Sequence, residues 1–139
     1  MKVLLVGEEA RRQELVEALP EGCKVDQADI AFEIELEDLP YYDVVFDLNA
    51  DEDTSIIDEY PFGGDVLIVA SSVKSSLAGM IDNIEYDGGI LGMNCLPTFI
   101  NRPLKEVSVY REQDVEDLKK LMSALGWDYQ LGNDRVGMI

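Results

Sequence analysis

The chain has 139 residues and a mass of 15.5 kDa, enough for one domain with a substantial core. Eleven Lys and Arg against 29 Asp and Glu give a net charge of −18, a field that excludes nucleic acid and anionic membrane surfaces as expected partners. No apolar run approaches the roughly 20 residues of a membrane helix. Cys23 and Cys95 lack metal-type spacing, so we expect a cytoplasmic protein with reduced thiols and no metal site.

The first residues predict the start of a parallel sheet. Residues 3–6 are a continuous apolar run that ends at Gly7, which is typical of a central strand buried on both faces. A helix is expected over residues 11–19, because apolar side chains recur there at helical spacing and Pro and Gly follow. Residues 23–26 predict a second, short strand.

The middle of the chain continues the alternation. Residues 28–36 alternate apolar with acidic or polar side chains, which favours a half-exposed strand, with a helix over residues 30–39 as the alternative. Further along, short apolar runs bounded by polar or glycine-containing turns indicate buried strands. These runs cover residues 42–48, 65–70 and 89–94.

The last third contains the clearest helix. A strand over residues 106–110 precedes a helix over residues 112–125, and a final strand is expected over residues 127–131. The helix places one apolar face at Val115, Leu118, Leu121, Met122 and Leu125. Acids cluster in its first turns and Gly126 is positioned to cap its end.

Alternating buried strands and amphipathic helices predict an α/β fold. We expect a Rossmann-like, doubly wound, mostly parallel sheet with helices on both faces. Internal repeats, low-complexity tracts and linkers are absent from the sequence, so residues 1–139 are expected to form a single domain.

The turn after the first strand is where a dinucleotide fold places a pyrophosphate, against the amino end of its first helix. Of the pattern G-x-G-x-x-G only Gly7 is present, while Glu9 stands at the second glycine and Arg12 at the third. Three interpretations stay open. In the first, Glu8 and Glu9 satisfy the helix end and nothing binds. In the second, Arg11 and Arg12 hold a phosphate by charge. In the third, a cofactor is bound elsewhere and this loop is rearranged.

The second mark of a dinucleotide site is an acid near the end of the second strand, about 20 residues further on, which binds the ribose hydroxyls. Asp26 and Asp29 lie near that distance. A solvated surface carboxylate is the alternative interpretation for each, because the chain has 29 acids.

Three blocks of sequence point to a family when they are taken together. Residues 43–51 read D-V-V-F-D-L-N-A-D, residues 70–77 read A-S-S-V-K-S-S-L, and residues 92–107 read G-M-N-C-L-P-T-F-I-N-R-P-L-K-E-V. With the C-terminal residues 134–139, these blocks resemble the 3-hydroxyacyl-CoA dehydrogenase family in the right order over most of residues 40–139.

The resemblance implies an NAD-binding domain and a set of site residues. By it Asp51 corresponds to a cofactor-side glutamate and Ser75 to the serine that hydrogen-bonds substrate. Asn94 stands where the family has its catalytic histidine, and Glu106 lies at the spacing of the glutamate that follows that histidine. The implied cofactor-side positions are Gly7, Glu9, Asp26 and Asp51.

The chain also departs from this family. It contains no histidine, and the amide of Asn94 cannot take the proton that an alcohol loses as hydride leaves. Without an imidazole to orient, Glu106 has no role in a triad. The segment before Tyr42 is too short for the family's helical arm. The chain ends at Ile139, where the family continues into a helical domain that supplies dimer contacts.

We therefore expect a divergent dehydrogenase domain with impaired or no activity, to which NAD binds weakly or not at all. The expected partners are an acyl-CoA or other small-molecule ligand, and a second copy or another protein. One alternative is an active NAD-dependent oxidoreductase, joined to a helical domain, in which Asp47, Asp51 or Glu106 acts as an unorthodox base. The other is an acidic protein-interaction module.

Overall fold

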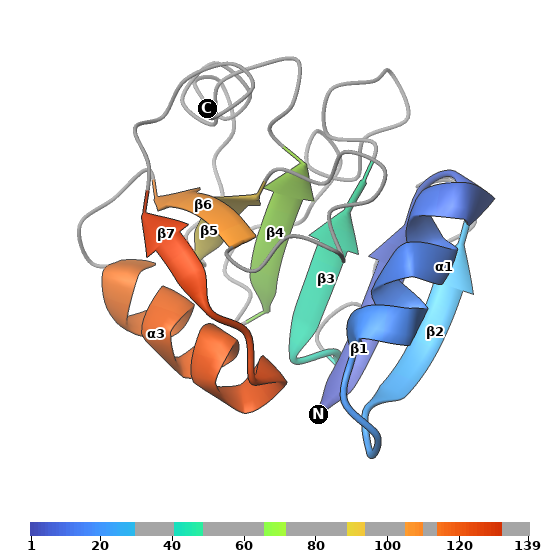
Figure 1. The fold of residues 1–139 in the computed structure, drawn as a ribbon. Helices are drawn as coiled ribbons and strands as arrows, with labels where there is room; N and C mark the ends of the chain where they lie inside the picture. The colour runs from blue at the N-terminus through green and yellow to red at the C-terminus, as the bar shows by residue number, and fades with distance from the viewer. Residues whose placement is uncertain (30–40, 49–65, 72–88, 94–104, 110–113, 132–139) are drawn as a thin grey trace.

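Within the described residues, the apolar runs form strands, and two of the segments between them form helices (Figure 1). The computed structural model describes residues 1–29, 41–48, 66–71, 89–93, 105–109 and 114–131. The strands are β1 (Lys2–Val6), β2 (Lys24–Ala28), β3 (Val44–Asp47), β4 (Leu67–Ser71), β5 (Ile90–Met93), β6 (Lys105–Val109) and β7 (Tyr129–Leu131). The helices are α1 (Glu9–Ala18) and α3 (Asp114–Leu125). Neither of these two helices is long and apolar enough to span a membrane.

The strands form one sheet in the order β2-β1-β3-β4-β5-β6-β7. The strands from β2 to β5 in this order run parallel, β6 is antiparallel to β5, and β7 is parallel to β6. The chain passes outward from β1 to β2 and then returns across β1 to β3, so the winding reverses between β1 and β3. This topology confirms the predicted α/β class with a Rossmann-like, mostly parallel sheet.

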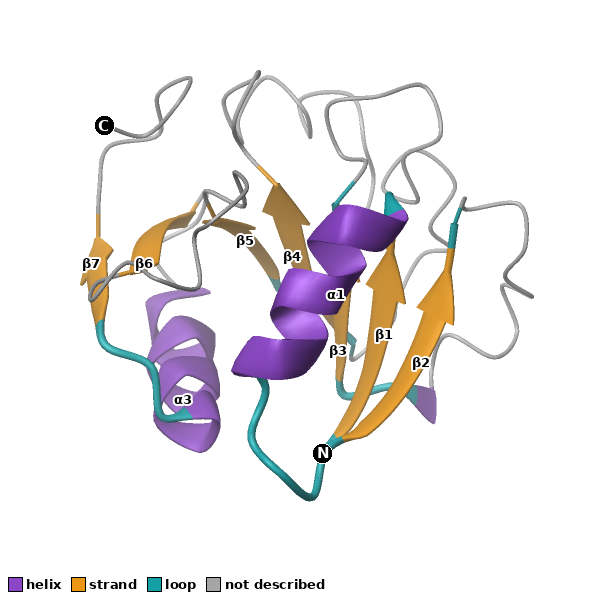
Figure 2. Ribbon diagram, turned by 45° about the vertical axis from the view of Figure 1, so that its right-hand side comes forward, coloured by secondary structure: helices purple, strands orange, loops and turns teal. Residues whose placement is uncertain are grey.

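One face of the sheet packs against both described helices (Figure 2). Alternate residues of the central strands, such as Leu5, Phe46 and Val69, share a buried cluster with Leu15 of α1 and Leu118 of α3. Because side chains alternate across a strand, their neighbours in sequence lie on the opposite face. Those neighbours are buried as well, and they include Leu4, Val45, Ile68 and Ile90. Both faces are therefore covered, as expected for a parallel sheet.

Most predicted elements are confirmed, with boundaries that differ by one or two residues, and the two differences at α1 and β2 are informative. α1 begins at Glu9, ahead of the predicted start. The sequence pattern did not show this start, because Glu9 and Ala10 are exposed and add nothing to the apolar periodicity. β2 continues through exposed Gln27 to buried Ala28, so Ala28 ends the second strand rather than opening another. The predictions for residues 30–39 lie outside the described residues.

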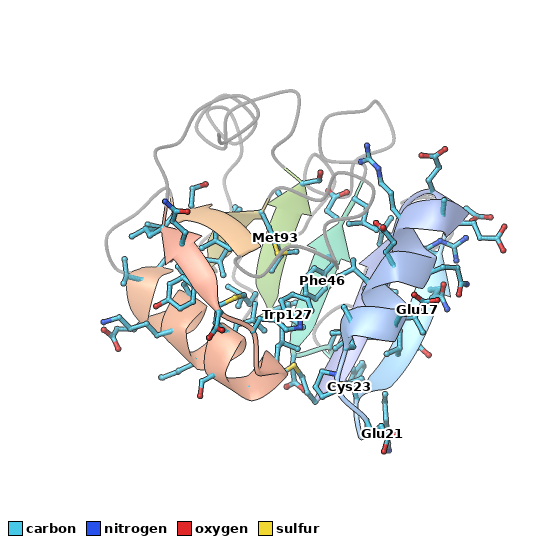
Figure 3. All side chains as sticks on the ribbon, in the orientation of Figure 1. Glu17, Glu21, Cys23, Phe46, Met93 and Trp127 are labelled. Atoms are coloured by element: carbon cyan, nitrogen blue, oxygen red, sulfur yellow. The ribbon has the colours of Figure 1, made fainter. Side chains whose placement is uncertain are left out.

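Trp127 joins the end of α3 to the end of α1 (Figure 3). Its indole Nε1 donates a hydrogen bond to the carbonyl oxygen of Ala18 at 3.1 Å. Its ring lies 6.4 Å from the ring of Phe46, tilted by 59°. Aromatic pairs at this separation and tilt contribute beyond their buried area, so Trp127 holds the two helices against the middle of the sheet.

Gly126 ends α3 as predicted. Its φ is +70°, its N–H donates to the carbonyl of Ser123 at 3.2 Å, and Trp127 N–H donates to the carbonyl of Met122 at 3.1 Å. These two bonds form the Schellman arrangement, in which a left-handed residue satisfies the last carbonyls of a helix.

Gly126→Ala should lower the free energy of unfolding by about 1–2 kcal/mol, because an L-residue resists this conformation. A Cβ at this position would meet no atom within 4 Å, so the cost is conformational rather than steric. Urea unfolding of both proteins measures the difference. Gly126→Asn, which tolerates the left-handed region better, should cost less; equal losses for the two variants would contradict this account.

Candidate functional site

In an open α/β sheet, ligands bind outside the carboxyl ends of the strands where the winding reverses. Here that place lies beyond the ends of β1 and β3. Gly7 follows β1 with a φ of +148°, a conformation that L side chains rarely adopt, and its N–H donates to the carbonyl of Ala28 at 3.0 Å. Leu48 N–H donates to the carbonyl of Val6 at 2.8 Å. The turn at Gly7 is therefore bonded to β2, and the end of β1 to the end of β3.

The helix that starts at this turn has two acids at its amino end. Glu8 is the N-cap residue, but its side chain makes no capping hydrogen bond, so it does not satisfy the helix end in that way. Glu9 lies in the first turn, where a carboxylate is stabilised by the helix dipole. Both side chains are exposed. They place negative charge where a phosphate would approach.

Arg12 is committed to protein groups. Its Nε donates to the carbonyl of Gly7 at 2.7 Å and its Nη1 to Gln27 Oε1 at 2.9 Å, while Nη2 pairs with the carboxylate of Asp29. The Arg12 side chain is 12% exposed and that of Asp29 is 68% exposed. The guanidinium thus ties the end of β1 to the end of β2, and its charge is paired with the exposed carboxylate of Asp29.

Arg11 reaches across the reversal point. Its Nη1 donates to the carbonyl of Leu48 at 3.0 Å in a partly buried position. Because Arg11 belongs to α1 and Leu48 follows β3, this bond spans the region between the two strands where a dinucleotide would lie. The interpretation that Arg11 and Arg12 hold a phosphate would require both side chains to release these partners.

Two buried polar side chains end the neighbouring strands. Asp47 is the last residue of β3 and is fully buried, on the sheet face that it shares with Val6 and Ala70. Ser71 ends β4, is fully buried, and its Oγ has no hydrogen-bond partner. Ser71 is not among the residues predicted from the sequence, because only its polarity at the end of an apolar run distinguishes it.

The residues predicted from the sequence fall in different places. Asp26 lies within β2, ahead of its end, and accepts a hydrogen bond from the Tyr42 hydroxyl at 2.7 Å in an exposed position. Glu106 belongs to β6, opposite Gln130 of β7, and its side chain is outside the described residues. Three further positions also lie outside them, namely Asp51, Ser75 and Asn94.

Among the described residues, the charges at the turn after β1 oppose the pyrophosphate of a dinucleotide. Exposed Glu8 and Glu9 repel it, and the nearby guanidinium groups are bonded to the protein. The unpartnered Oγ of Ser71 is a feature that a ligand at this edge would satisfy, but it does not remove the charge conflict.

Comparison with known proteins bears on the fold. No protein-family model and no curated protein sequence matches the chain. Among solved structures, the 3-hydroxyacyl-CoA dehydrogenase of Archaeoglobus fulgidus superposes with a TM-score of 0.71 at 13% identity, covering 97% of this chain and 57% of that one. A 5-formyl-3-hydroxy-2-methylpyridine 4-carboxylic acid 5-dehydrogenase, described as an NAD⁺-dependent dismutase, gives 0.69 at 15% identity, covering 99% and 59%.

A hypothetical protein from Sinorhizobium meliloti gives a TM-score of 0.61 at 11% identity, covering 94% of this chain and 84% of that one. The chain therefore spans less than two thirds of the two dehydrogenases that it resembles, at 57% and 59% of their lengths. At such identities the likeness establishes the fold alone: a Rossmann-like α/β domain of the kind on which these dehydrogenases are built.

Proposed function

We propose that the chain is a divergent 3-hydroxyacyl-CoA dehydrogenase-like domain that has lost efficient dinucleotide binding and has impaired or no dehydrogenase activity. The three sequence blocks support the choice of family, and the fold shared with the Archaeoglobus enzyme is consistent with it. The absence of histidine from the sequence supports the loss of activity, because Asn94 cannot accept the substrate proton.

One observation carries this proposal: the arginine contacts at the reversal point. Arg12 fills the position of the third glycine and bonds to Gly7, Gln27 and Asp29, while Arg11 bonds to Leu48 across the region between β1 and β3. The guanidinium groups that could otherwise bind a phosphate thus donate to protein acceptors, and exposed Glu8 and Glu9 stand at the helix end where a pyrophosphate would bind. The role that remains is to bind a protein partner or a weak small-molecule ligand such as an acyl-CoA.

A second candidate is an active oxidoreductase in which Asp47 acts as the base when the domain is joined to a helical domain. The fully buried position of Asp47 at the carboxyl end of β3 favours it, since this is the edge where a substrate would react. To act as the base, Asp47 must lie within hydrogen-bonding reach of the proton that it takes from the substrate. Asp47→Asn should abolish turnover under this candidate and change no activity under the first.

NADH should fail to saturate the purified chain below about 1 mM, which corresponds to a binding free energy weaker than about −4 kcal/mol. The fluorescence of NADH, followed as it is titrated into the chain, measures this binding.

Glu9→Gly should tighten NADH binding about threefold to tenfold, because it removes a charge that faces the phosphate. Under the proposal, Arg11 obstructs the site, so Arg11→Ala should leave NADH binding unchanged or strengthen it. If Arg11 instead holds a phosphate, the same change should weaken NADH binding.

Glu17→Gly is the matched control, since Glu17 is an exposed acid of the same helix further from its amino end. It removes the same charge and adds the same flexibility away from the turn (Figure 3). Saturation of the unaltered chain at micromolar NADH would overturn the proposal. Equal gains from Glu9→Gly and Glu17→Gly would show that the net charge of the chain, rather than the turn, limits binding.

A further inference from the structure

The described sheet ends in two strands, β2 on one side and β7 on the other (Figure 2). Among the described contacts, the backbone of β7 pairs with β6 alone. An outermost strand presents the backbone N–H and C=O groups on its outer side for pairing with another strand. What the side chains of each outermost strand carry decides whether such pairing can occur.

The two outermost strands differ in charge. β2 has the exposed charged side chains of Lys24 and Asp26, and charges on an edge strand oppose the addition of a further strand. β7 consists of Tyr129, Gln130 and Leu131 and carries no charge, although 29% of the residues in the chain are charged. β7 is therefore the edge of the described sheet that is open to pairing.

Leu131 leaves an apolar surface beside this open edge. Tyr129 and Leu131 lie on the same face of β7, because side chains alternate along a strand. Tyr129 is partly buried against the core, and Leu131 is in register with Val107 of β6, a core residue. Leu131 is nevertheless 50% exposed. A further strand that places a large apolar side chain next to Leu131 would complete this face.

We propose that β7 pairs with β7 of a second copy of the chain, antiparallel and about a two-fold axis at Gln130. A two-fold axis is the commonest symmetry of soluble oligomers. This register sets Gln130 opposite Gln130 of the second copy and Tyr129 opposite Leu131 of the second copy. Residues that are directly opposite lie on one face and interact, so each exposed Leu131 is covered by a tyrosine ring.

The distribution of charge favours this arrangement of two copies. Each copy carries a net charge of −18, so the copies repel each other overall and meet best at an uncharged strand. Asp128 precedes β7 and is exposed. Antiparallel pairing places the two Asp128 residues at opposite ends of the paired strands, whereas parallel pairing in register would set them side by side. A basic partner would instead be attracted to the acidic surface.

This interface is independent of the proposed function. The turn at Gly7 and the contacts of Arg11 and Arg12 lie at the carboxyl ends of β1, β2 and β3, whereas β7 is the outermost strand beyond β6. NADH titration tests the turn and the mass of the particle tests β7, so either can fail without the other.

Sedimentation velocity of the whole chain over increasing concentration is the first test. The chain should pass from a monomer of 15.5 kDa to a dimer. Because two short strands form a small interface, the Kd is expected on the order of 0.1 mM. Raising NaCl from about 0.05 to about 0.5 M should lower this Kd, since salt screens the repulsion between the copies. Association with a basic partner would weaken under the same change.

Leu131→Lys tests the edge. It should raise the Kd more than about tenfold, because a lysine on an edge strand opposes pairing, even though it makes the net charge less negative. Tyr41→Lys is the matched control: it replaces another exposed apolar residue, 71% exposed and ahead of β3, with the same charge. It should change the Kd less than about twofold. Far-UV circular dichroism confirms that each variant is folded.

Cross-linking tests the register. Residues directly opposite on antiparallel strands have Cα atoms about 4.5–5.5 Å apart, a separation that a disulfide spans. In a chain that carries Cys23→Ala and Cys95→Ala, Gln130→Cys should therefore form a disulfide between two copies under mild oxidation. Asp128→Cys in the same background should not, because its two copies lie at opposite ends of the paired strands.

Three results would each overturn the proposal. The first is a chain that remains monomeric up to about 1 mM at both salt concentrations. The second is a dimer that Leu131→Lys and Tyr41→Lys affect equally. The third is cross-linking through Asp128→Cys that is as fast as cross-linking through Gln130→Cys.

Discussion

Phe46→Ala should lower the free energy of unfolding by about 3–5 kcal/mol, the usual loss for a large aromatic side chain removed from a core. Phe46 is 0% exposed and lies on β3, in the interior of the sheet. Its side chain belongs to the cluster that joins α1 and α3, and its ring contacts Trp127. Truncation leaves a cavity between three elements that cannot collapse together, so both buried area and packing contacts are lost.

Urea unfolding followed by circular dichroism measures this loss. Tyr41→Ala is the control, because Tyr41 is an aromatic residue shortly before the same strand but is 71% exposed, so its loss should stay within about 0.5 kcal/mol. Phe46→Leu should cost roughly 1–1.5 kcal/mol, since it fills most of the same space. A Phe46→Ala loss below about 1.5 kcal/mol would mean that this cluster does not hold the fold together.

Arg12→Met should lower the free energy of unfolding by about 2 kcal/mol. The exposed ion pair with Asp29 contributes little of this, since such pairs contribute about 0–1 kcal/mol. The larger part comes from the short bond to the Gly7 carbonyl and the bond to Gln27, because both lose a charged donor on a side chain that is mostly buried. Methionine keeps the aliphatic stem and removes only the guanidinium.

The comparison for Arg12 is Lys119→Met. Lys119 forms an exposed pair with Glu116 at 3.6 Å, and its removal should change the free energy of unfolding by less than about 0.5 kcal/mol. Arg12→Lys should recover part of the loss, because an ammonium keeps the charge but not the three-way donor geometry. If Arg12→Met and Lys119→Met were equally mild, the guanidinium would not be what ties β1 to β2.

The central strands and α3 could be predicted from the sequence, because their buried positions are occupied by apolar residues. β1, β3, β4 and β5 are buried on both faces and appear as uninterrupted apolar runs. α3 buries one face and shows the matching helical period. The start of α1 is predicted less well, since Leu15 is its only fully buried residue and its first two residues are exposed. The strand order lay beyond sequence reasoning, because pairing depends on contacts between distant segments.

The site was predictable only as a set of alternatives. The sequence showed that glycines were missing beyond Gly7, but it could not choose between arginines that hold a phosphate and arginines that do not. The deciding partners, Leu48, Gln27 and Asp29, lie 37, 15 and 17 residues from the arginines that they bind. A pocket lined by Met1, Asp43, Leu67 and Leu121 could not be predicted for the same reason, since its walls come from four separate parts of the chain.

The bond between Trp127 and Ala18 joins residues 109 positions apart, and this separation has a consequence for synthesis. A nascent chain leaves the ribosome amino end first, so α1 is made long before the indole that bonds to its last residue. Until Trp127 emerges, the ring of Phe46 lacks its aromatic neighbour and the Ala18 carbonyl lacks its donor. A product terminated before residue 127 therefore exposes core surface, which quality-control proteases and chaperones recognise.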